Sequence, residues 1–117
     1  MNHKNLDVWN KSIALVKEVY SKTKEFPVDE KFGIVNQIQR AAVSVPSNIA
    51  EGCARCSDKE LLRFLDISHG SLAELETQLI ISEQLGYIEA SDLLKQIESI
   101  GQMLSGLKRH IKQKRNT

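Results

Sequence analysis

The chain has 117 residues, a length that suits one domain with one core, and 41% of them are hydrophobic while 26% are charged. Two prolines and six glycines are too few for a collagen-like, linker-rich or disordered chain. Its net charge of +1 argues against strong non-specific binding of nucleic acid by the whole domain, while its polar start and lack of a long apolar run predict a cytoplasmic protein without membrane contact.

The first predicted helix opens near Asp7 and ends before Pro27, which pushes the preceding residue out of the helical region. Apolar residues spaced by three and four form its predicted core stripe: Leu6, Trp9, Ile13, Val16 and Tyr20. A second apolar row lies beside this stripe: Val8, Leu15, Val19 and Phe26. Two rows exceed what one face of a bundle needs, so we expect the excess to be buried against another subunit.

The second predicted helix begins at about Asp29 or Glu30 and ends near Gly52. Its stripe consists of Val35, Ile38, Ala42, Val45 and Ile49. Pro46 lies inside this pattern and removes one backbone hydrogen bond. Because the stripe continues in phase beyond the proline, we predict one helix that is kinked near Pro46.

Two further helices are predicted in the second half of the chain. Ser57 and Glu60 have the spacing of a capping box, and Gly86 marks the end of the third helix. Ser91 is the expected cap of the fourth. Their core rows are Leu61, Leu65, Ser68, Leu72, Leu75 and Leu79, and then Leu93, Ile97, Ile100, Leu104, Leu107 and Ile111. Short connections predict an all-α fold, an antiparallel up-down-up-down four-helix bundle that forms a single domain over residues 1–117.

Polar side chains are concentrated around the predicted kink and on the facing part of the third helix. The expected network comprises Arg40, Ser44, Ser47, Asn48, Glu51, Arg55, Glu74 and Gln78. Asn48 and Ser44 can bond backbone groups that the proline frees, and the arginines can pair with carboxylates across helices. One interpretation is a structural network that fixes the helix register, and the alternative is a site for a ligand or partner.

No motif in the sequence predicts an enzyme, a metal site or a cofactor site. Cys53 and Cys56 have the C-x-x-C spacing, but zinc needs four ligands, the three histidines are scattered, and the strands around a redox pair are missing. His69 near Asp66 suggests a catalytic pair, although a histidine on a solvated helix face more commonly has no such role. We therefore expect a protein without catalytic activity, metal or cofactor.

Charge is distributed unevenly along the chain. Lys and Arg outnumber Asp and Glu by eight to six in residues 1–57, are outnumbered by nine to three in residues 58–98, and stand at five to none in residues 99–117. The five cations are Lys108, Arg109, Lys112, Lys114 and Arg115, in a basic end that spans 108–117. They complement the negative end of the helix dipole, and as an alternative they contact nucleic acid or an acidic protein.

Several runs of residues carry a resemblance to a known family. These runs are Asp7–Trp9, Phe26–Pro27, Arg40–Gly52, Gly70–Leu79 and Leu85–Ile88. Over nearly its whole length the chain resembles the bacterial four-helix-bundle proteins encoded in intervening sequences of 23S ribosomal RNA genes. The resemblance implies an up-down bundle that assembles into a homopentamer. A further similarity in fold, to the accessory protein of diversity-generating retroelements, suggests binding to nucleic acid and a reverse transcriptase.

Together these observations lead to two functional hypotheses from different classes. The first is a non-enzymatic, oligomeric four-helix-bundle scaffold that binds RNA or a ribonucleoprotein through the basic end. The alternative is a protein–protein interaction module without a nucleic-acid role. A metal protein or enzyme centred on Cys53 and Cys56 is the least favoured of the interpretations.

Overall fold

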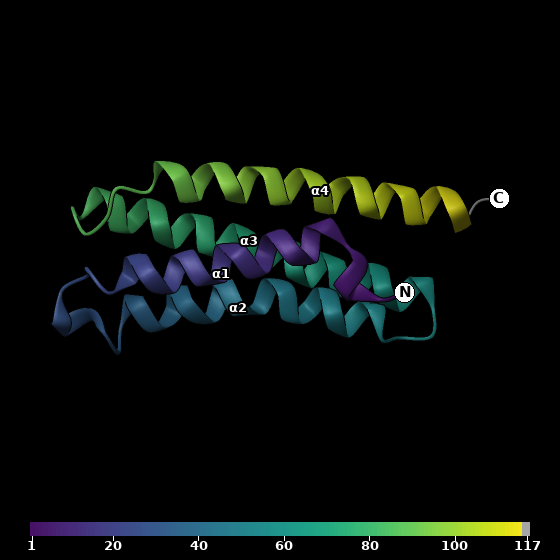
Figure 1. The fold of residues 1–117 in the computed structure, drawn as a ribbon, viewed down its shortest axis with the longest axis horizontal. Coiled ribbons are helices and arrows are strands. Elements are labelled where there is room, and N and C mark those ends of the chain that lie inside the picture. Colours follow the sequence, from purple (N-terminus) through teal and green to yellow (C-terminus); the bar gives the residue numbers. More distant parts are fainter. Residues whose placement is uncertain (116–117) are drawn as a thin grey trace.

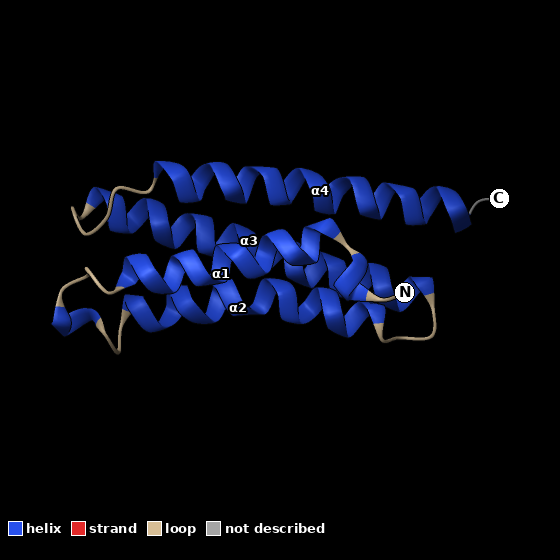
Figure 2. Ribbon diagram, in the orientation of Figure 1, coloured by secondary structure: helices blue, strands red, loops and turns tan. Residues whose placement is uncertain are grey.

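Four antiparallel α helices form the protein in a computed structural model, which describes residues 1–115 (Figure 1). They are α1 (Asp7–Thr23), α2 (Ile34–Cys53), α3 (Asp58–Gln84) and α4 (Ser91–Arg115). Two 3-10 turns, η1 (His3–Asn5) and η2 (Val28–Glu30), precede α1 and α2. The described residues contain no strand (Figure 2), so the predicted all-α four-helix bundle is confirmed. Its extents of 51 × 22 × 20 Å follow from helices that lie side by side.

The boundaries of α3 follow the predicted capping residues. The Ser57 hydroxyl accepts a hydrogen bond from the Glu60 backbone N–H at 3.2 Å, which caps the helix at its first turn. At the other end Gly86 has φ +80°, and the N–H of Tyr87 donates to the carbonyl of Ser82 at 2.9 Å. This pair of features is a Schellman ending, in which glycine takes the left-handed conformation at no steric cost.

The predicted start of α2 was wrong by four or five residues, and that of α4 by one. Residues 28–30 form η2, and α2 begins only at Ile34, after Gly33 breaks the chain direction with φ −108° and ψ −114°. Ser91 is the first residue of α4 and does not act as its cap. Its hydroxyl and its backbone N–H both donate to a Glu89 carboxylate oxygen, the N–H at 3.0 Å, and these two bonds lower the pKa of Glu89. A carboxylate before the helix therefore takes the role predicted for the hydroxyl.

The second helix continues through Pro46 and past Gly52 to Cys53. The predicted function of Gly52 as a helix stop was wrong, because this glycine is buried against α3. A Cβ at position 52 would lie 2.9 Å from the Cβ of Phe64 and 3.1 Å from a Leu61 methyl group. Gly52 is needed for the close approach of two helices. The kink at Pro46 stays a prediction, since the helix is uninterrupted there.

The core consists of the predicted stripes of α2, α3 and α4, together with one row of α1. For α1 the expected roles of the two apolar rows were reversed. Val8, Leu15, Val19 and Phe26, expected to lie beside the core stripe, are buried inside the protomer. Trp9, Ile13 and Val16 of the expected stripe are only half-buried, and Tyr20 is exposed. Spacing alone could not decide between the rows, because both follow the same helical period.

None of the helices described for residues 1–115 is both long enough and apolar enough to cross a lipid bilayer.

Candidate functional site

The polar residues near Pro46 form a small cluster between α2 and α3. Asn48 donates through its side-chain nitrogen to the carbonyl and the hydroxyl of Ser44, each at 2.8 Å. The Ser44 hydroxyl lies 2.7 Å from the hydroxyl of Ser71 on α3. Buried Ser68 adds a further bond across this boundary, because its hydroxyl donates to the Val45 carbonyl at 2.8 Å. These bonds fix the register of α2 against α3.

The other predicted members of the network do not join this cluster. Arg55, which follows the end of α2, pairs with Glu51 in the last turn of that helix at 3.1 Å, and both side chains are exposed. Gln78 donates to Glu74 at 3.2 Å within α3, while its own buried carbonyl oxygen has no hydrogen-bond partner among the described residues. No bond between described residues brings Arg40 or Ser47 into these groups. The predicted constellation is therefore three separate local arrangements. Of its members on α2 only Ser44 forms a hydrogen bond with α3, while Asn48 bonds Ser44 within α2.

The predicted role of Asn48 at the proline was also partly wrong. The backbone carbonyl that loses its helical partner is that of Ala42, four residues before Pro46. Asn48 instead donates to the carbonyl of Ser44 in the same turn. The sequence identified the correct turn of the helix but not the correct acceptor, because an asparagine side chain reaches most easily to the carbonyl four residues before it.

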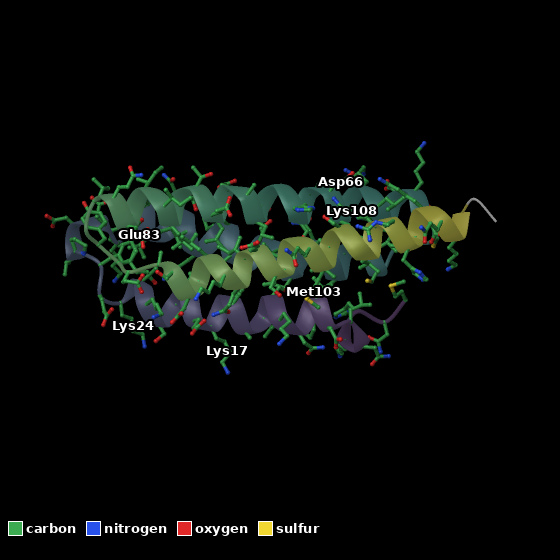
Figure 3. The ribbon with its side chains drawn as sticks, turned by 90° about the horizontal axis from the view of Figure 1, so that it is seen from above. Lys17, Lys24, Asp66, Glu83, Met103 and Lys108 are labelled. Carbon is green, nitrogen blue, oxygen red and sulfur yellow. The ribbon has the colours of Figure 1, made fainter. Side chains whose placement is uncertain are left out.

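The basic end of α4 divides into one internal cation and several exposed ones. Lys108 on α4 bonds Asp66 on α3 at 3.1 Å and the Nδ1 atom of His69 at 2.9 Å (Figure 3). Its side chain is only 17% exposed. Arg109, Lys112 and Lys114 are exposed, whereas the side chain of Arg115 lies outside the described part of the structure. Sequence reasoning missed the bond from Lys108, because positions 42 residues apart show no spacing signal.

The last turns of α4 extend beyond the rest of the bundle. Figures 1 and 3 both show α4 continuing past the loop that joins α2 to α3. Ile111 is buried and is the last packed residue of the helix, so Lys112 and Lys114 lie on a projecting segment. A phosphate chain can reach this segment without displacing another helix.

His69 has its pKa lowered below the usual 6.5, first by partial burial and then by the ammonium group of Lys108. The neutral ring accepts a hydrogen bond at Nδ1, so its remaining proton is on Nε2. The predicted pair with Asp66 is indirect, because Lys108 lies between the two side chains. This arrangement holds α3 and α4 together and leaves His69 without a carboxylate that could orient it as a general base.

The two cysteines are separated by the end of α2 and differ in environment. Cys53 is buried in the core, and burial raises the pKa of its thiol, whereas Cys56 is exposed in the following turn. Both are free thiols in the structure. Among the described residues, no group of three or more His, Cys, Asp or Glu side chains is placed to hold a metal ion. A raised pKa reduces the thiolate fraction on which redox and metal chemistry depend.

An exposed apolar groove runs between α1 and α2. It has a volume of about 270 Å³ and is lined by Trp9, Ile13, Val16, Val43, Pro46, Ser47 and Ala50. The first three residues are the half-buried members of the α1 row that was expected to be the core stripe. Sequence reasoning predicted surplus apolar surface on α1, but it did not identify these residues or their partners on α2.

One of two comparisons with known proteins finds a family for this chain. A search among curated proteins finds no match. The family model described as 23S rRNA-intervening sequence protein matches residues 4–106, so the match includes the groove and the serine cluster but stops before the cations at 108–115. Because the match spans most of the 117 residues, the chain belongs to the 23S rRNA-intervening sequence protein family.

Proposed function

We propose that the protein is a non-enzymatic, cytoplasmic scaffold that self-associates and binds RNA or a ribonucleoprotein through the projecting end of α4. The observation that carries this proposal is the segment after Ile111, where exposed cations extend beyond the bundle. Phosphate groups are attracted to such a segment with little need for base contacts. No Phe, Tyr or Trp accompanies the cations, so the proposed recognition is of the backbone and not of stacked bases.

The structure changes which cations we assign to this contact. Lys108 is removed from the proposed set, because its side chain is only 17% exposed. The set keeps the exposed side chains of Arg109, Lys112 and Lys114, and Arg115 follows them in the sequence. A single segment of this kind binds weakly, but several copies in one oligomer act together and raise the overall affinity.

The test is a salt titration of RNA binding with two variants of equal charge. In the first, Arg109→Gln, Lys112→Gln and Lys114→Gln neutralise the α4 end. In the control, Lys11→Gln, Lys17→Gln and Lys95→Gln remove three exposed cations elsewhere. We expect the first variant to reduce the slope of log K against log salt by about 3, and the control to change it by less than about 1. An equal change in both would show general charge attraction and would overturn the assigned contact.

Self-association is proposed to use the groove between α1 and α2. Its apolar residues lie on one continuous surface, and such surfaces in monomeric proteins commonly mark interaction sites. A second copy is the occupant we propose, in agreement with the pentamer that the family resemblance implies. The oligomer would then present several α4 ends to one RNA.

Two substitutions at equally exposed positions test the groove. Val43 lines it and Ile80 on α3 does not, and both side chains are 39% exposed. We expect Val43→Glu to give a monomer and Ile80→Glu to leave the oligomer intact when masses are measured by light scattering after size exclusion. If the wild-type protein is a monomer at high concentration, the proposed assembly is wrong. Dissociation by Ile80→Glu alone would move the interface to α3.

A protein–protein interaction module is the second candidate function. The groove itself favours it, because an apolar surface binds a partner protein as readily as a second copy. Affinity purification with and without nuclease separates the two candidates. A partner that is retained after nuclease treatment supports the module, whereas a partner lost on nuclease treatment supports the RNA scaffold. Metal bound after anaerobic purification would instead revive a role for Cys53 and Cys56.

A further inference from the structure

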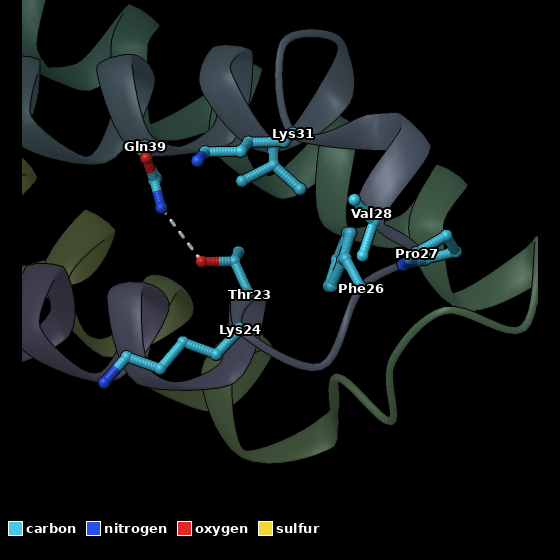
Figure 4. A pocket seen from close by; sticks show the side chains of 8 residues that line it. Thr23, Lys24, Phe26, Pro27, Val28, Lys31 and Gln39 are labelled. Atoms are coloured by element: carbon cyan, nitrogen blue, oxygen red, sulfur yellow. Dashed lines mark hydrogen bonds between the residues drawn. The ribbon is translucent and has the colours of Figure 1, made fainter.

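A pocket lies where α1 passes into α2, at the opposite end of the bundle from the projecting part of α4 (Figure 4). Its volume is about 340 Å³, which falls in the range of pockets that bind small molecules. The walls come from the end of α1, the turn η2 and the first turns of α2. Three consecutive segments therefore shape it without a contribution from another subunit.

The two sides of this corner pocket differ in chemistry. Figure 4 shows Phe26, Pro27 and Val28 on one side, while the side chains of Lys24 and Lys31 extend toward the other. Phe26 is buried, whereas Val28 is 86% exposed, so the apolar side continues to the surface. Val35, also buried, adds to the apolar lining. A ligand that matches both sides has a hydrocarbon part and a polar group at one end.

The charge at the polar end is positive. Lys24 and Lys31 are the charged residues among the described side chains that line the pocket, and both are exposed. Neither forms an ion pair with another described residue, although the Lys31 ammonium lies 5.6 Å from the ring centre of Phe32. The nearby start of α2 has no side-chain cap, which adds the positive end of a helix dipole. An anionic group is therefore favoured over a neutral or cationic one.

A hydrogen bond between Gln39 and Thr23 lies between the two lysines, and it is made entirely within the protein. The Gln39 side-chain nitrogen donates to the Thr23 hydroxyl at 3.1 Å (Figure 4). That hydroxyl in turn donates to the Tyr20 carbonyl at 3.2 Å. This chain of bonds fixes the distance between the end of α1 and the first turns of α2. Because the hydroxyl is engaged, the side-chain donors that remain for a ligand are the two ammonium groups and the second N–H of the Gln39 amide.

We propose that the corner pocket binds an amphiphilic carboxylate, whose hydrocarbon part packs on Phe26, Val28 and Val35 while Lys24 and Lys31 bind its carboxylate. Such a ligand can be a free organic acid or the C-terminal residue of a peptide, since both present a carboxylate beside an apolar group. The pocket lies at the opposite end of the bundle from the cations assigned to RNA, and it shares no lining residue with the groove assigned to self-association. Either of those assignments can fail without affecting this one.

The experiment is a titration of the full chain, labelled with nitrogen-15, with octanoate and with octanamide, which has the same hydrocarbon part and no charge. Two leucine-ending peptides, one with a free C-terminal carboxylate and one amidated, test the peptide source. We expect the amide resonances of residues 23–39 to shift with the carboxylate probes. Binding of octanoate would show that a free organic acid is a sufficient ligand. If only the peptide with a free C-terminal carboxylate binds, the ligand is the C-terminal end of a peptide.

Two variants of equal charge complete the test. Lys24→Gln with Lys31→Gln removes the pocket cations, and Lys11→Gln with Lys17→Gln removes two exposed cations of α1 outside the pocket. The first variant loses two exposed ion pairs with the carboxylate, so we expect its affinity for the carboxylate probes at low salt to fall by about five- to tenfold. We expect the second variant to lose less than about twofold. The proposal would be overturned if octanoate and octanamide bound equally, or if both variants lost the same affinity. It would also be overturned if the shifts were centred on Trp9, or if neither octanoate nor the peptide with a free C-terminus bound.

Discussion

The boundary between α2 and α3 differs in construction from that between α3 and α4. Small residues line the first, where Gly52 meets Phe64 and the Ser68 hydroxyl bonds directly to the Val45 carbonyl. The second includes a long lysine side chain and an open crevice of about 150 Å³ beside His69 and Gly101. Close packing leaves no room for adjustment, while long polar side chains can move. We therefore expect substitutions at the first boundary to cost more stability.

The largest effect is expected for Gly52→Ala. The new methyl group would lie 2.9 Å from the Cβ of Phe64, so the helices must separate, and the free energy of unfolding should fall by about 1–3 kcal/mol. Gly70→Ala is the matched control, because a Cβ there meets no atom within 4 Å. Its stability should rise by up to about 1 kcal/mol from helix propensity. Urea denaturation measures both, and a stable Gly52→Ala protein would contradict the close approach.

A smaller loss is expected for Ser68→Ala. The substitution removes the buried donor to the Val45 carbonyl, and the free energy of unfolding should fall by about 0.5–1.5 kcal/mol, the usual net contribution of one hydrogen bond. Thr77→Ala removes an exposed hydroxyl that donates to Ala73 within the same helix, and it should change stability by less than about 0.5 kcal/mol. Equal effects of the two substitutions would mean that the bond across the helices contributes nothing special.

The smallest effect concerns pH and the boundary between α3 and α4. The pKa of His69 is lowered in the folded protein, so between that value and the unfolded value of about 6.5 the unfolded state binds more protons. The contribution of this group is complete above pH 6.5 and is lost as the pH falls through the folded pKa. Urea denaturation between pH 7.5 and 5.5 should show a decline that is absent in His69→Gln.

Direct titration of His69 by nuclear magnetic resonance sharpens this test. The pKa should lie below 6.5 in the wild type and rise toward the usual value in Lys108→Met, where the neighbouring ammonium is removed. A wild-type pKa above 6.5 would contradict the hydrogen bond from Lys108. Replacement of His110, which is exposed nearby on α4, serves as a control that should leave the titration of His69 unchanged.

Much of the fold was predictable because it depends on local patterns. The stripes of α2, α3 and α4 and the Gly86 ending appear in the structure where spacing and composition placed them. The α1 rows were reversed because Leu15 and Trp9 are both apolar at helical spacing, and only the positions of neighbouring helices decide which is buried. Gly52 was misread as a stop for the same reason, since a close approach of helices leaves no mark in the local sequence.

The polar and charged sites were less predictable than the core. Sequence reasoning grouped Ser44 with Asn48 correctly, because they are four residues apart on one helix. It could not bring Lys108 to His69, or Ser68 to Val45, since these pairs depend on the register between helices. The corner pocket also escaped notice. Its cations lie in the connection between α1 and α2, Lys24 directly after α1 and Lys31 directly after η2, and the turn η2 was expected to be part of a longer helix.

The position of Trp9 has a practical consequence. It is the only tryptophan in the chain, and it is half-buried in the groove between α1 and α2, with the ring of His3 at 5.0 Å. Its fluorescence emission therefore reports how much water reaches that surface. A shift toward longer wavelength on dilution would follow the release of whatever covers the groove, without any added label.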